Sequence, residues 1–271
     1  MKKDDLNLAI KWAENEGWNP GVHDASSFYQ TDQNGFFMGY LQQKPISCIS
    51  AVAYDDKFGF LGFYIVKPEF RGKGLGIKIW ERGIGYLQDR NIGLDGVIAQ
   101  QRNYEKYGFK TSHKNIRFAG IVERTHNLSE NLCDLRNFSV EKLINYDAKV
   151  FSINRSKFLI EWVNQNQSKA LGFLSGRDLK GYGVIRPCGI GFKIGPLFAE
   201  NGQIAQELFQ GLVQNLIGKT VFLDVPEPNS HALAFVNKNN MTKVFETVRM
   251  YNKYIPNLST EIFGITTLEL G

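Results

Sequence analysis

The sequence has little cysteine, and its cysteines and histidines do not suggest a crosslink or a metal site. The three cysteines, Cys48, Cys133 and Cys188, are odd in number and widely separated, and none belongs to a CxxC pair. This argues against a disulfide framework and a cysteine-based zinc site, and is typical of a reducing compartment. The histidines show no spacing with other ligand types. We therefore expect no metal.

Long hydrophobic runs are also missing. No stretch approaches the ~20 apolar residues that a membrane-spanning helix requires. Lys2 and Lys3 lie near the amino terminus, but acidic residues follow them and no apolar core of a signal peptide appears. These features predict a cytoplasmic protein without a membrane partner.

Charge of one sign is not concentrated in any segment. The formal net charge is +5 over 271 residues, and Lys and Arg do not form runs interleaved with aromatic residues. The sequence therefore does not predict nucleic-acid binding, whereas a mildly basic surface suits a polyanionic cofactor. The length exceeds what one core usually organises, and 43% hydrophobic residues supply enough apolar area for two.

The first half of the chain shows a helix, three strands, a helix, a strand, a short helix and a strand. Helical patterns cover 5–16, 77–89 and 100–107. Strand patterns cover 35–41, 46–54, 58–66, 94–99 and 109–119. The short turns between the first three strands predict an antiparallel meander.

The second half repeats this order in a weaker form. Strand patterns cover 168–175, 181–186, 220–225 and 244–251, and helical patterns cover 203–216 and 229–237. The segment 195–202 (GPLFAENG) takes the place of the loop KPEFRGKGLG in the first half. We predict two domains of one fold, 1–125 and 137–271, with a polar linker over 121–135.

Residues 71–76 (RGKGLG) lie between a strand pattern and a helix pattern. The N–H groups at a helix start lack internal partners and carry partial positive charge, and glycines let a phosphate approach the backbone. Arg71 and Lys73 add charge-assisted contacts. The segment lacks the GxxxxGK[ST] of a P-loop, and antiparallel strands do not suit a dinucleotide fingerprint. A pyrophosphate loop and a glycine-rich turn without a ligand are the interpretations that remain.

This loop resembles the acetyl-CoA motif [Q/R]xxGx[G/A] of the GNAT (general-control-related N-acetyltransferase) superfamily, with Arg71, Gly74 and Gly76 at the motif positions. YIVKPEFRG and NYEKYGF resemble the family's flanking segments, so the similarity spans 35–119. WNPG at 18–21 and the tail FGITTLELG are similar to a two-domain subgroup. The resemblance implies an α/β fold of tandem GNAT-like units, each with a mostly antiparallel mixed sheet splayed at the cofactor site and flanked by helices.

The resemblance implies acetyl-CoA as the cofactor, bound in the first unit alone. The second unit lacks the RxxGxG sequence, and Glu200 in its GPLFAENG segment would repel a phosphate. The residues expected to hold the cofactor are Ile65, Val66, Arg71, Gly72, Lys73, Gly74, Leu75, Gly76, Asn103 and Tyr107.

Two groups are expected, by resemblance, to act on the thioester. The N–H of Val66, freed by a bulge at the end of its strand, would polarise the thioester carbonyl. Tyr104 would protonate the leaving sulfur, because a phenol stays protonated at neutral pH; Tyr107 takes this role if the register is shifted. Tyr104 is otherwise a packing residue, and Asn103 either bonds the pantetheine arm or caps the short helix.

The acceptor site is expected between the two units, since ligand clefts favour domain interfaces. Asp224 and Asn229 occur at the end of a second-unit strand and would recognise a cationic amine; the alternative for Asn229 is a helix cap. His23 and Asp24 are candidates for this cleft, and Trp18 lines it or anchors the first helix in the core. No residue stands out as the general base.

These features predict an acetyl-CoA-dependent N-acetyltransferase that acetylates a small-molecule primary amine by direct attack in a ternary complex. The alternatives are an enzyme acting on a protein N-terminus or lysine, and a non-catalytic acyl-CoA sensor. The sequence allows either a monomer or a homodimer.

Overall fold

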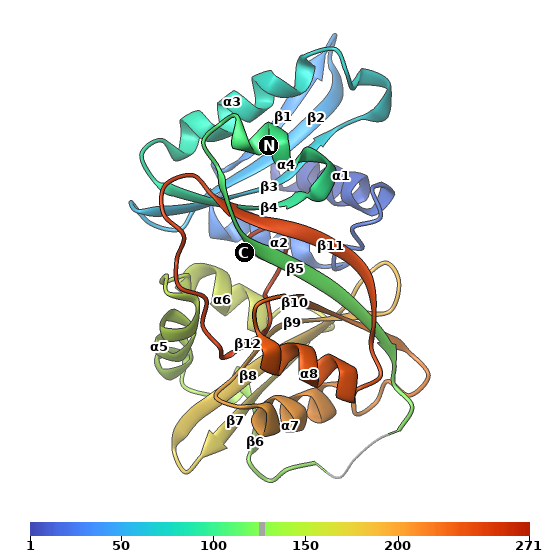
Figure 1. Ribbon diagram of the computed structural model, residues 1–271, viewed down its shortest axis with the longest axis vertical. Helices are drawn as coiled ribbons and strands as arrows, with labels where there is room; N and C mark the ends of the chain where they lie inside the picture. The colour runs from blue at the N-terminus through green and yellow to red at the C-terminus, as the bar shows by residue number, and fades with distance from the viewer. Residues whose placement is uncertain (125–127) are drawn as a thin grey trace.

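The structure, a computed structural model, describes residues 1–124 and 128–271. The first unit contains α1 (Lys3–Asn15), α2 (Asp24–Thr31), β1 (Phe36–Leu41), β2 (Lys44–Ala53), β3 (Phe58–Val66), α3 (Leu75–Leu87), β4 (Asn91–Val97), α4 (Gln101–Glu105) and β5 (Lys110–Ile121). The second unit contains β6 (Leu132–Asp134), α5 (Val140–Phe151), α6 (Ser156–Val163), β7 (Lys169–Ser175), β8 (Asp178–Pro187), β9 (Phe192–Ala199), α7 (Gly202–Val213), β10 (Thr220–Pro226), α8 (Ser230–Lys238), β11 (Thr242–Tyr251) and β12 (Ile262–Gly264). The two units lie at opposite ends of an elongated molecule (Figure 1).

The sequence pattern located most elements, and the differences lie mainly in the second unit. The segment 195–202 was expected to be a loop, and this is wrong for its first part, which is the end of β9. It is a strand because it pairs with β8 on one side and with β12 on the other. The expected linker contains β6, which pairs with β7. The sequence analysis did not predict α5 and α6. The domain boundary expected at residue 125 lies outside the described residues.

The two units share a single sheet through exchanged strands. Twelve strands of the described residues form it, in the order β1-β2-β3-β4-β11-β5-β10-β9-β8-β7-β6, with β12 paired to β9. The second unit's β11 lies between β4 and β5, and the first unit's β5 pairs with β10. In Figure 1 these two long strands run side by side across the middle of the molecule. Each unit thus supplies the strand that completes the other's sheet, so the two halves do not form separate sheets.

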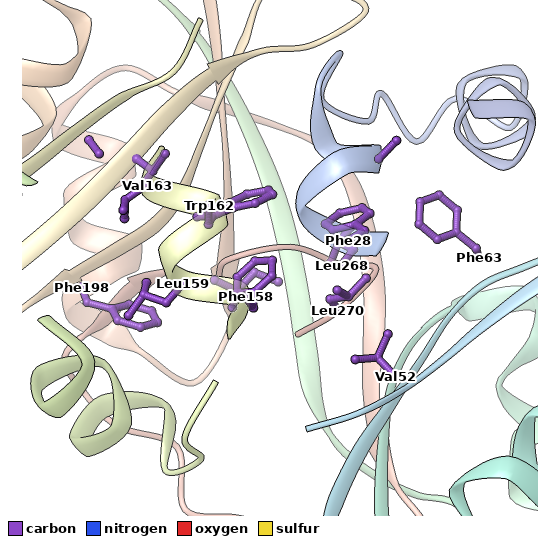
Figure 2. Packing of buried hydrophobic residues seen from close by; sticks show 14 of the residues in the cluster. Phe28, Val52, Phe63, Phe158, Leu159, Trp162, Val163, Phe198, Leu268 and Leu270 are labelled. Atoms are coloured by element: carbon purple, nitrogen blue, oxygen red, sulfur yellow. The ribbon is translucent and has the colours of Figure 1, made fainter. Parts of the chain in front are cut away.

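A hydrophobic core joins the units on one face of the sheet. Helix α2 packs against α6, and the ring of Phe28 stacks on that of Trp162 with their centroids 5.8 Å apart. Leu268 and Leu270 of the C-terminal tail belong to the same core, beside these rings (Figure 2). Burying a large apolar side chain contributes about 1.5–3 kcal/mol, so this core holds the units in one arrangement.

Helices α3 and α4 cover the other face of the first unit's strands. Their Trp80 and Tyr104 pack in a separate core with Ile49, Ala51 and Leu61 of the sheet. Because side chains alternate between the faces of a strand, Cys48 and Val52 of β2 point instead into the core that joins the units. No helix among the described residues is both long and apolar enough to cross a bilayer.

Candidate active site

The site begins where two parallel strands of the first unit separate. Strands β3 and β4 pair from Phe58 opposite Asn91 to Leu61 opposite Leu94, and not beyond. Residues 62–66 of β3 therefore border a gap on the side of β4. A strand edge beside such a gap presents backbone donors and acceptors to an extended ligand.

The backbone N–H of Val66 points into this gap. On the other side of β3, Lys67 donates to the carbonyl of Ile46 at 2.9 Å, and Val66 lies opposite Ser47. In an antiparallel pair, hydrogen-bonded and non-hydrogen-bonded positions alternate, so Val66 is a non-hydrogen-bonded position whose N–H faces away from β2. This geometry supports the expected donor role of Val66.

Strand β3 carries a bulge near its end. The register with β2 shifts between Cys48, which pairs with Ile65, and Ser50, which pairs with Gly62, so β3 carries the extra residue. Phe63, inside this segment, has a φ of +46°. The bulge expected towards the end of this strand is therefore present, between Gly62 and Ile65. The N–H of Val66 is freed by strand alternation and by the divergence of β4.

The loop after β3 leads into an open helix terminus. Gly72 and Gly74 have φ values of +71° and +72°, in the left-handed region that favours glycine. Gly74 is the N-cap of α3, and no side chain caps that terminus. A Cβ at either glycine would meet no atom within 4 Å. The first N–H groups of α3 are thus free to bind an anion.

The two basic residues of the loop are held by the protein itself. The Nε of Arg71 donates to the Val66 carbonyl at 2.7 Å, and its guanidinium forms an ion pair with Glu16 after α1. The Nζ of Lys73 donates to the Glu69 carbonyl at 2.8 Å. Arg71 lines the cavity described below and Lys73 does not.

One cavity of about 510 Å³ joins the loop, the fork between β3 and β4, and the C-terminal tail. It reaches the α3–α4 side of the sheet through Trp80 and Tyr104, and the opposite side through Leu268 and Glu269. The expected site residues in its wall are Trp18, Ile65, Val66, Arg71, Gly72, Gly74, Leu75, Gly76 and Tyr104. A ligand at the α3 terminus and one at the tail can therefore meet in the same cavity.

Tyr104 is a buried wall residue of this cavity. Its ring packs on Trp80, with centroids 5.4 Å apart. Burial and the neighbouring Tyr64 raise the pKa of its hydroxyl, so it stays protonated at neutral pH. Tyr107 is 39% exposed and Asn103 hydrogen-bonds to Gln100; neither lines the cavity.

The acceptor residues expected near the second unit are occupied elsewhere. Asp224 forms a buried ion pair with Arg117 at 2.7 Å, and Asp24 forms another with Arg186 at 2.8 Å. Asn229 caps α8 by accepting from two of its backbone N–H groups, which is the alternative role noted above. These three and His23 are not in the cavity wall. The charges of Asp24 and Asp224 are matched by arginines inside the protein, so these two acids do not supply a free group to a ligand there.

Four residues of the cavity wall on the side of the tail were not predicted from the sequence. Phe245 and Thr247 come from the exchanged β11, and Leu268 and Glu269 come from the tail. Apart from the family-like tail sequence, no local signal marks them, because they reach the first unit only through strand exchange and the path of the tail.

The corresponding fork of the second unit is filled by the chain itself. Strands β9 and β10 pair from Phe192 to Ile194 and then diverge. In the gap, β12 pairs with β9, and Ile265 donates to the Asp224 carbonyl at 2.9 Å. The N-terminus of α7 is capped by the side chain of Asn201. This supports the expectation that only the first unit binds a cofactor.

Gly62 is the first residue of β3 beyond the fork, and a methyl group there is expected to displace the tail. A Cβ at Gly62 would lie 2.0 Å from the Glu269 carbonyl oxygen. We expect Gly62→Ala to lower the free energy of unfolding by about 1–3 kcal/mol, as overpacking does. Urea unfolding measures this. Gly85→Ala, in α3 with no neighbour within 4 Å, is the matched control and should be neutral or slightly stabilising. Equal stability of Gly62→Ala and wild type would contradict the tight contact.

Comparisons with known proteins agree with this geometry. Residues 5–109 match the profile of the acetyltransferase (GNAT) family, and residues 143–264 match that of an acetyltransferase (GNAT) domain. The holothin acyltransferase of Pseudoalteromonas sp. (strain SANK 73390) is 30% identical, over 99% of this chain and 92% of the relative. A putative acetyltransferase from Pyrococcus horikoshii superposes with a TM-score of 0.84 at 19% identity, covering 100% of this chain and 94% of the other. A tandem GNAT protein from the clavulanic acid biosynthesis pathway superposes with a TM-score of 0.62 at 9% identity, covering 95% and 98%. The chain belongs to the GNAT family of acyltransferases and carries two GNAT units.

Proposed function

We propose that this protein is an acetyl-CoA-dependent N-acetyltransferase that acetylates the primary amine of a small molecule by direct attack in a ternary complex. One observation carries the proposal: the uncapped terminus of α3, Val66 and Tyr104 all line one cavity that passes through the sheet. Acetyl-CoA, when bound, supplies the activated thioester carbonyl.

The residues of the first unit suit this cofactor. The N–H groups at the start of α3 and the loop glycines offer donors to a diphosphate, and Arg71 adds a positive charge. The free edge of β3 offers backbone groups to the amides of the pantetheine arm. The N–H of Val66 stabilises negative charge developing on the carbonyl oxygen, and Tyr104 donates a proton to the departing sulfur.

The acceptor enters from the side of the C-terminal tail. The cavity there is lined by residues of both units, so the acceptor and the cofactor can be bound at the same time. This favours direct attack over a two-step transfer through the enzyme. The relative from Pseudoalteromonas is named for acylation of holothin. We extend the broader class, acyl transfer to a small molecule, to this chain.

Two assays test the proposal. Acetyl-CoA at 100 times its dissociation constant should stabilise the fold by about 2.7 kcal/mol and raise the thermal midpoint by several degrees. CoA release should then be measured with benzylamine, phenethylamine and tryptamine, and with a peptide carrying a free N-terminus and a lysine. Turnover with the small amines is expected. Turnover with the peptide alone would contradict a small-molecule acceptor, and binding without turnover would indicate a sensor.

A further inference from the structure

The C-terminal tail brings Glu269 to the fork between β3 and β4. The backbone of Glu269 passes directly against Gly62, the first residue of β3 beyond its pairing with β4. Glu269 lines the cavity, yet only 3% of the residue is exposed. Its Oε1 atom is buried and has no hydrogen-bond partner among the described residues. A buried carboxylate oxygen left without a partner is costly, and at a cavity wall it points to a ligand that completes it.

The other buried carboxylates nearby are already paired. Asp24 and Asp224 each form an ion pair with an arginine within the protein. Asp95, which also lines the cavity, is bonded by Arg249 and Asn115. Among the acids of this region that the structure describes, Glu269 is the carboxylate with an unfilled oxygen.

The charges around Glu269 come from four other elements. Burial raises its pKa, the cations of Lys193, Arg117 and Arg186 lower it, and Asp24 raises it; the net direction is upward. Lys193 on β9 is itself buried, and burial together with Arg117 lowers its pKa to about 8. Lys193 therefore remains mostly charged at pH 7 and favours the ionised form of Glu269.

We infer that Glu269 is the carboxylate that binds the ammonium group of the acceptor and removes its proton. This inference rests on the proposed function and assigns the general base of that reaction. The carboxylate of Glu269 takes one proton from R–NH₃⁺, and the neutral nitrogen attacks the thioester carbon. The C–N bond forms as the C–S bond breaks, and Tyr104 gives its proton to the sulfur. The second nitrogen proton restores the Tyr104 phenol, and Glu269 releases its proton to solvent, so the transfer yields amide, CoA thiol and one H⁺.

The walls beside Glu269 define the class of acceptor. The wall here has the apolar side chains of Trp18, Phe63, Phe245 and Leu268. Its unpaired polar groups are the carboxylate of Glu269 and the neutral hydroxyl of Thr247. Such a site favours a single ammonium group on an apolar or aromatic body, because a second charge would be buried without a partner.

The test is Glu269→Gln, which keeps the shape of the side chain and removes its basicity. Two probes of similar body are compared: benzylamine, which is protonated at pH 7, and O-benzylhydroxylamine, which is neutral there. We expect kcat/KM for benzylamine to fall about 100-fold or more and kcat/KM for O-benzylhydroxylamine to fall less than about fivefold, because no proton has to be removed before its attack. The loss with benzylamine should shrink as pH rises and free amine accumulates in solution.

Glu261→Gln is the matched control on the tail. Glu261 accepts from Tyr146 and Lys149 outside the cavity, so its loss should leave kcat/KM unchanged. The thermal shift with acetyl-CoA should be equal in both variants and wild type. Turnover of O-benzylhydroxylamine by Glu269→Gln would show that this variant is folded. Equal losses for both probes, or no loss, would overturn the base assignment while leaving the proposed function intact. Absence of transfer by the wild type to any amine would overturn both.

Discussion

Replacement of Gly74 by glutamate is expected to abolish binding of acetyl-CoA. Gly74 is the N-cap of α3, and a Cβ there points into open space at the terminus that we propose binds the diphosphate. A glutamate would place a negative charge and its side chain at that position. We expect the dissociation constant to rise at least 100-fold, which corresponds to about 2.7 kcal/mol. Isothermal titration calorimetry with acetyl-CoA measures this loss.

The backbone strain of that substitution needs its own control. Gly74 has a φ of +72°, so any side chain there costs roughly 1–2 kcal/mol of stability. Gly218 has a φ of +75°, open space around it, and a position outside the cavity wall. Gly218→Glu should therefore lose similar stability but bind acetyl-CoA normally. Normal binding by Gly74→Glu would mean that α3 does not hold the diphosphate.

Replacement of Tyr104 by phenylalanine is expected to lower kcat about 100-fold with little change in acetyl-CoA affinity. The ring still packs on Trp80, but the cavity loses the hydroxyl that we propose protonates the sulfur. Steady-state kinetics with the best small amine, together with calorimetry, separates the two effects. Tyr107→Phe is the control. Tyr107 lies outside the cavity wall, so this substitution should leave kcat and acetyl-CoA affinity unchanged.

The pH profile gives a second test of this role. Burial raises the pKa of Tyr104, so its hydroxyl should remain a proton donor throughout the usual assay range. The rate of the wild type should therefore not fall through ionisation of Tyr104 below pH 10. Full activity of Tyr104→Phe would show that the assignment to Tyr104 is wrong. A fall in kcat in Tyr107→Phe instead of Tyr104→Phe would show the same.

Local sequence was enough to predict the strand, loop and helix that we propose bind the cofactor. The strand over 58–66 and the helix after RGKGLG follow from side-chain period and from glycines that alone adopt positive φ without strain. These are interactions between residues a few positions apart. The exact position of the bulge in β3 depends on the register with β2, which the pattern of β3 alone does not specify.

The half of the cavity that we propose binds the acceptor could not be predicted in the same way. Asp224 looked like a free acid at a strand end, but its partner Arg117 lies 107 residues away on an exchanged strand. No sequence pattern around Glu269 marks it as a site residue. Glu269 reaches Gly62 because the tail crosses both forks of the sheet. The same tail fills the second fork with β12 and leaves the first one open.

The sequence by itself determined that this chain has two units of one family and that the first carries the glycine-rich loop that we propose binds phosphate. The strand, loop and helix patterns on which this rests depend on side-chain period and backbone preference among residues that are close in the sequence. Only the tertiary structure decided that β5 and β11 are exchanged, that one fork is closed, and that Glu269 lies at the other. These contacts join segments far apart in the chain, and burial and strand pairing across the whole molecule select them.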